Sequence, residues 1–180
     1  MGYGIVSRLF HWLTVLIVLV MIPVGLTMVQ EIPKATQDRL FILHKGLGSV
    51  FLVVILLRVC WRIVVPPSPL PATIPSWQRR AAGAVHLGLY ALLLVMAVSG
   101  YVRVTTGGFP IEWLNALGIP PLFPKAEGVS KIASGVHAVA KNLLIVLIAV
   151  HVAAAIQHGF RRDGILSRMW PPVPGSRQGR

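Results

Sequence analysis

Four long apolar blocks constrain this chain more than any other feature of its sequence. Each has the ~20 residues that a helix needs to cross a hydrocarbon core about 30 Å thick. The composition agrees, because 55% of the residues are apolar and only 12% are charged, which is typical of membrane proteins. We therefore predict an all-α membrane protein, a four-helix transmembrane up-down bundle. The blocks run roughly over Leu9–Val29, Leu40–Val65, Ala81–Val102 and Ile132–Phe160.

The connections between the blocks are too short to hold a soluble domain, so we expect one domain over residues 1–170. The second connection, "VVPPSPLPATIPSW", has five prolines, which forbid a continued helix. The third contains "FPIEWLNALGIPPLF", which predicts either a short amphipathic helix on the outer interface, anchored by Trp113 and Phe123, or an irregular loop. The tail at 171–180 is rich in proline and glycine and is expected to be disordered.

The net charge of +12 raises the question of nucleic-acid binding, but the charge distribution favours another explanation. Ten arginines fall at the N-terminus, in or beside the second connection, or in the C-terminal tail. Four of the five acidic residues fall in the other two connections or beside them. By the positive-inside rule both termini are cytoplasmic and the first and third connections face outward. We interpret the arginines as determinants of topology, and no nucleic-acid partner is expected.

The chain has six histidines, five of them well inside the apolar blocks. Polar side chains at membrane depth are costly and usually mark function, although a single one is more often an interhelical hydrogen bond. His137 and His151 are 14 residues apart in one block, so one helix presents them about 40° from alignment and ~21 Å apart along its axis. The fourth helix thus places one imidazole near each membrane face.

Each of these imidazoles needs a partner at its own depth. His44 matches His137 at the outer side, whereas His11 and His86 both compete to pair with His151 at the inner side. Paired imidazoles across a bundle hold a haem iron at both axial positions. Zinc, the rival, prefers three or four clustered ligands. The only cysteine, Cys60, belongs to no CxxCH motif, so we predict that haem is held non-covalently.

In its histidine-bearing motifs the chain resembles the bacterial cytochrome b561 family. The resemblance rests on "SRLFHWLTVLIVL", "LHKGLGSVFLVVILLRVCWR", "AVHLGLYALLLVMAVSGY" and the helix "GVHAVAKN…VHVAAAIQHGF", and it covers residues 7–170. It implies a dihaem b electron carrier of the bacterial inner membrane; one branch of the family oxidises superoxide and passes the electrons to ubiquinone. Carried over by position, the ligands of two haem b groups would be His11 and His151 at the inner side, and His44 and His137 at the outer side. Lys141, one turn after His137, departs from the neutral residue expected there.

The resemblance leads us to expect two substrate sites. Basic residues at the outer face, namely Lys45, Arg103 and Lys131, would attract a small anionic donor such as superoxide. At the inner side His158, His86 and Arg8 would surround a quinone head group, as hydrogen-bond and proton donors. Two alternatives stay open: a haem-bearing membrane anchor of a partner dehydrogenase or hydrogenase, and a haem-free helical scaffold or transporter.

Overall fold

The computed structural model describes residues 3–170, and within that range it is entirely helical. All four long helices are apolar enough to span a membrane, so the predicted fold class is confirmed. The predicted disorder of 171–180 lies outside the described residues. The long helices are α1 (Ile5–Thr27), α2 (Lys34–Val64), α3 (Ser76–Thr106) and α5 (Glu127–Arg161), joined by a short α4 (Glu112–Ala116) and followed by a 3-10 turn η1 (Leu166–Met169).

Proline and glycine set several of the helix ends. Pro33 and Pro75 stand immediately before α2 and α3, where a residue without an N–H costs the helix nothing. Beyond α5 the backbone takes positive φ at Arg162 (52°) and Gly164 (81°), and this turn reverses the chain toward η1. Pro23 lies inside α1 without ending it, as neighbouring structure in a membrane helix permits.

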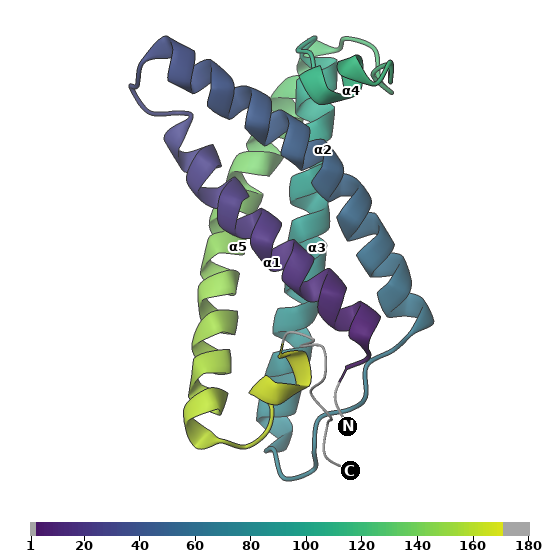
Figure 1. The fold of residues 1–180 in the computed structure, drawn as a ribbon, viewed down its shortest axis with the longest axis vertical. Helices are drawn as coiled ribbons and strands as arrows, with labels where there is room; N and C mark the ends of the chain where they lie inside the picture. The colour runs from purple at the N-terminus through teal and green to yellow at the C-terminus, as the bar shows by residue number, and fades with distance from the viewer. Residues whose placement is uncertain (1–2, 171–180) are drawn as a thin grey trace.

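The helices alternate in direction, as an up-down topology requires (Figure 1). Helix α3 packs along α5 and against α2, while α1 packs on α2. The start of α1 and the end of α5 lie at the same end of the molecule (Figure 1). We call this the inner end, after the predicted topology, and the end that carries α4 the outer end.

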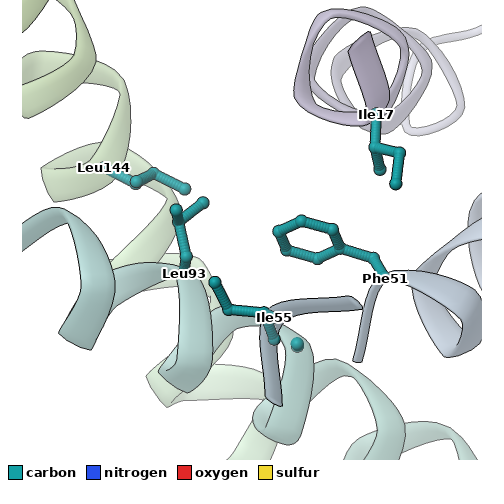
Figure 2. Packing of buried hydrophobic residues seen from close by; sticks show 6 residues of the cluster. Ile17, Phe51, Ile55, Leu93 and Leu144 are labelled. Carbon is teal, nitrogen blue, oxygen red and sulfur yellow. The ribbon is translucent and has the colours of Figure 1, made fainter. Parts of the chain in front are cut away.

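An apolar cluster fills the middle of the bundle. It draws Ile17 from α1, Phe51 and Ile55 from α2, Leu93 and Ala97 from α3, and Leu144 from α5 (Figure 2). Ile55 is fully buried. In α5, Leu144 lies midway between His137 and His151, so the cluster separates an outer group of histidines from an inner one. Many leucines and valines on the opposite helix faces are exposed, as lipid-facing residues of a membrane bundle are.

Candidate functional site

The outer histidines both lie against glycine. A Cβ atom added to Gly25 of α1 would stand 2.9 Å from Cε1 of His44, and one added to Gly100 of α3 would stand 3.1 Å from Cε1 of His137. Real Cβ atoms essentially never show the first distance, and the second is tighter than most real contacts, so a side chain at either position would press on the imidazole. The two rings also lie close enough for electrostatic interaction. Helix backbone from α1 and α3 therefore fixes where the two imidazoles sit.

The hydrogen bonds of His137 are those of a metal-ligating histidine. Its Nδ1 lies 3.1 Å from the carbonyl oxygen of Met96 and 3.1 Å from Oγ of Ser99. A carbonyl oxygen only accepts, so Nδ1 carries the proton and Nε2 keeps its lone pair for a ligand. Such a bond to a carbonyl orients many metal-bound imidazoles. Nδ1 of His44 is buried and has no hydrogen-bond partner among the described residues.

The inner histidines form a group of three. Ring centres of His11 and His151 lie 6.4 Å apart, and those of His86 and His151 lie 5.3 Å apart. Two imidazoles on opposite sides of one metal ion, with bonds of about 2.0–2.1 Å and about 1.2 Å from nitrogen to ring centre, would have ring centres about 6.4–6.6 Å apart. The His11–His151 pair agrees with this span, while His86 stands too close to His151.

Arg58 affects whether His11 could serve as an iron ligand. Its Nη2 lies 3.3 Å from Nδ1 of His11, and a guanidinium can only donate. Nδ1 is therefore the acceptor and the His11 proton sits on Nε2. If His11 held an iron through Nε2, its proton would have to lie on Nδ1, and Arg58 could then no longer donate to that atom. The assignment of His11 over His86 therefore stays a prediction that the ring spacing favours.

These features test whether the residues suit a haem. The histidines offer pairs at two depths, two of the rings rest in glycine-lined spaces, and Nε2 of His137 is free. Within residues 3–170 no group of three or more histidines, cysteines or acids is arranged to hold a metal ion, which is what a zinc site would need. The donor set therefore fits a cofactor that takes two axial imidazoles per iron.

Lys45, a predicted outer anion-binding residue, already has an anionic partner. Its Nζ donates to Oε1 of Glu112 at 2.8 Å and to the carbonyl of Pro110 at 2.7 Å, and its side chain is 14% exposed. Burial raises the pKa of the Glu112 carboxyl, but the hydrogen bond and charge of Lys45, together with a backbone hydrogen bond, outweigh burial and hold that pKa below its usual value. The remaining candidates are Arg103, which lies near both outer histidines, and Lys131, which is exposed.

The predicted quinone residues are not brought together by direct contacts. His86 lies beside His151, whereas Arg8 donates to the carbonyl of Trp170 at 3.4 Å. His158 pairs through Nδ1 with Asp163, just beyond α5, at 2.5 Å. The hydrogen bond with His158 lowers the pKa of the Asp163 carboxyl.

The third connection contains a helix of five residues, and its Trp113 has a role that the sequence did not predict. Atoms of the Trp113 ring would lie 2.2–2.6 Å from a Cβ on Gly46, so the indole packs on α2 beside Lys45. Glycines beside His44 and His137 in the sequence suggest space for a flat cofactor. Gly46 instead admits Trp113, and Gly135 has open space around it. The glycines that touch the imidazoles, Gly25 and Gly100, come from neighbouring helices.

The fold and the site define a class: a four-helix membrane protein with paired imidazoles at two depths, suited to b-type haem. Comparison with known proteins gives the family. The family model for prokaryotic cytochrome b561 matches residues 2–172. Cytochrome b561 homolog 2 of Escherichia coli K12 is 35% identical over 170 residues, which is 93% of this chain and 90% of that protein.

Two further relatives agree. Cytochrome b561 homolog 1 of Escherichia coli K12 is 29% identical over 109 residues, 60% of this chain and 58% of that protein. A protein named probable superoxide oxidase CybB, from Yersinia pestis, is 24% identical over 173 residues, 92% of this chain and 93% of that protein. The chain belongs to the prokaryotic cytochrome b561 family. It is a bacterial membrane electron-transfer protein, and its family implies that it binds b-type haem.

Proposed function

We propose that this protein is a dihaem oxidoreductase that passes electrons from superoxide at the outer face to the quinone pool. The observation that carries the proposal is the division of the histidines into an outer and an inner group, separated by the apolar cluster of Figure 2. Two redox sites near opposite faces would form one path across the membrane. We also propose that the protein lies in the bacterial inner membrane with both termini in the cytoplasm.

Each histidine pair would hold one cofactor. His44 and His137 would provide the outer axial ligands, and His11 and His151 the inner ones. When bound, haem b supplies one-electron redox chemistry at each site. Because the protein would supply both imidazole ligands of each haem iron, neither substrate would need to bind iron. The protein residues therefore determine which molecules approach the cofactor edge.

At the outer end, Arg103 and Lys131 are the residues that would gather a small anion. The ammonium of Lys45 is neutralised by Glu112, so we assign it the smaller share of the attraction. Arg103 lies near both outer histidines, which puts its positive charge where a one-electron donor such as superoxide would react.

At the inner end, quinone reduction needs two protons as well as two electrons. His158 and His86 would supply hydrogen bonds and protons to the quinone carbonyls, with Arg8 as a further donor. His158 is held by Asp163, so a carboxylate stands behind it that could return a proton from the aqueous side. Because His86, His158 and Arg8 make no direct contact with one another, each would approach the quinone head group from a different side.

A reduced-minus-oxidised spectrum with haem quantification tests the proposal most directly. We expect two b-type haems per chain, and a purified protein without haem, after expression with ample haem, would refute it. Next, a superoxide source should reduce the haems, and added ubiquinone should reoxidise them.

Ionic strength tests the choice of donor. Reduction by superoxide should slow as salt is added, because salt screens the attraction between exposed charges. Arg103→Gln should weaken this salt dependence more than Lys45→Gln does. A rate indifferent to both salt and Arg103→Gln would argue against superoxide as the donor.

A further inference from the structure

The segment that follows α5 folds back onto the start of α1. Nε1 of Trp12 donates to the carbonyl of Met169 at 2.7 Å, and the backbone N–H of Tyr3 donates to the carbonyl of Arg168 at 3.2 Å. These bonds hold η1 at the inner end of the bundle, where Figure 1 shows it. They also carry Arg168 into the bundle, although it lies far from α1 in the sequence.

Three arginines and two tyrosines stack there. The guanidinium carbon of Arg168 lies 5.5 Å from the ring centre of Tyr3. That of Arg62 lies 6.0 Å from Tyr3 and 5.8 Å from Tyr90. That of Arg58 lies 5.1 Å from Tyr90, and its Nε donates to the Tyr90 hydroxyl at 3.3 Å. We call these five residues the arginine–tyrosine cluster. Residues from α2, α3 and both ends of the described chain thus gather three positive charges.

No carboxylate within the described residues 3–170 pairs with these arginines. Within residues 3–170 the four ion pairs involve Lys34, Lys45, Lys125 and His158, and none includes an arginine. Arg168 is only 9% exposed. Its Nη2 donates to the carbonyl of Ser68 at 2.6 Å, but its Nε and Nη1 are buried without a partner in the described chain. A buried cation needs a compensating anion, so the cluster has the donors and charge of an anion site.

The position of the cluster indicates which anion. Four of its members, together with Ser7 and Trp61, line a small cavity at the inner end. Trp12 and Trp170 lie beside η1, and such tryptophans mark the headgroup level of a membrane. The cluster borders the Nδ1 side of His11, where Arg58 stands, whereas an iron would be bound through Nε2. A haem propionate therefore suits it less well than a headgroup does.

We propose that the arginine–tyrosine cluster binds the phosphate of an anionic phospholipid from the leaflet at the inner end. Guanidinium groups form paired, charge-assisted hydrogen bonds with phosphate oxygens. Arg58 and Arg62 line the cavity, and Arg168, which stacks on Tyr3 of the cavity wall, has two N–H-bearing nitrogens without a partner in the described chain. Basic pockets between membrane helices at this level bind anionic headgroups in other proteins. A neutral quinone head group would leave three positive charges uncompensated. The bound phosphate would tie α1, α2, α3 and η1 together at the inner end.

Lipid-dependent stability of the haem-loaded full chain tests this site. The protein is reconstituted in phosphatidylcholine alone, or with added phosphatidylglycerol, and its melting temperature is measured. We expect phosphatidylglycerol to raise the melting temperature by about 4 °C or more, and native mass spectrometry to show it retained. Arg62→Gln and Arg168→Gln should each lose most of the shift and of the retained lipid. Arg80→Gln, an exposed arginine at the start of α3, should keep both.

Three outcomes would overturn the proposal. If Arg62→Gln and Arg80→Gln lose the shift equally, the effect is general surface charge. If inorganic phosphate in neutral detergent gives the full shift, the ligand is a soluble anion and not a lipid. If Arg62→Gln lowers the haem content in phosphatidylcholine alone, the cluster serves the cofactor. Arg62 is half-buried and on the cavity wall, so its variant stays informative even if Arg168→Gln does not fold.

Discussion

The outer and inner histidine groups are built by different means. At the outer end, His44 and His137 rest against the glycine positions of neighbouring helices, and a backbone carbonyl orients His137. At the inner end, His11, His86 and His151 are packed among side chains. None of the described glycines approaches an inner histidine. Backbone positions are fixed once the helices pack, whereas side chains rearrange. The outer site is therefore set by the fold, and the inner site has alternatives.

The largest expected effect concerns those alternatives. Because the ring spacing of His11 and His151 matches an iron between two imidazoles, His11→Leu should lose one of two haems and retain the outer one. His86→Leu should keep both haems and chiefly impair quinone reduction. Haem per chain, with the spectrum of each remaining haem, checks both variants. If His86→Leu drops to one haem while His11→Leu keeps two, helix α3 carries the inner ligand and His11 does not.

The next effect tests the glycines of the outer site. A methyl group at Gly100 meets the His137 ring and one at Gly25 meets the His44 ring, so each alanine variant should displace an imidazole. We expect Gly25→Ala and Gly100→Ala to weaken outer haem binding at least about tenfold, with the inner haem retained. Gly83→Ala, where the added Cβ meets nothing within 4 Å, is the control. Full outer haem content in both variants would show that the outer rings adapt as easily as the inner ones.

The sequence predicted the fold well because the pattern of a membrane bundle is simple. Spans of about 20 apolar residues are recognisable in a sequence, although α2 and α3 begin at Lys34 and Ser76, ahead of the predicted blocks that start at Leu40 and Ala81. The sites were harder. The contact of Gly25 with His44 depends on how α1 crosses α2, and one apolar helix gives no sign of it. Similarly, Asp163 and Arg168 are drawn to the inner end by a turn at positive φ, in a segment that lies beyond the last predicted span.

A smaller effect is expected at the ion pair between Lys45 and Glu112, near the outer end. The lowered pKa of Glu112 means that its ion pair with Lys45 stabilises the fold above the ordinary carboxyl pKa. That contribution is lost as the pH falls through the lowered pKa. Because Glu112 is 36% exposed on its side chain, we expect less than about 1 kcal/mol. Glu112→Gln should reduce the loss of melting temperature on acidification. Glu31→Gln, exposed and in none of the ion pairs of the described residues, is the control, and equal acid sensitivity in both would contradict the pairing.

The smallest effect should appear at the end of α5, where Asp163 holds His158. Asp163→Asn removes the charge that orients this imidazole, but the pair lies at the inner surface and leaves both haem sites intact. If His158 delivers protons to quinone, Asp163→Asn should slow quinone reduction only about two- to threefold, far less than the about 10²- to 10⁴-fold contribution of a whole acid–base group, because His158 itself remains. Haem content and reduction by superoxide should not change. Arg161→Gln, one exposed charge nearby, controls for surface electrostatics. If both Asp163→Asn and His158→Gln reduce quinone at the rate of the unaltered protein, His158 takes no part, and the proton path must start from His86, beside the inner haem ligands.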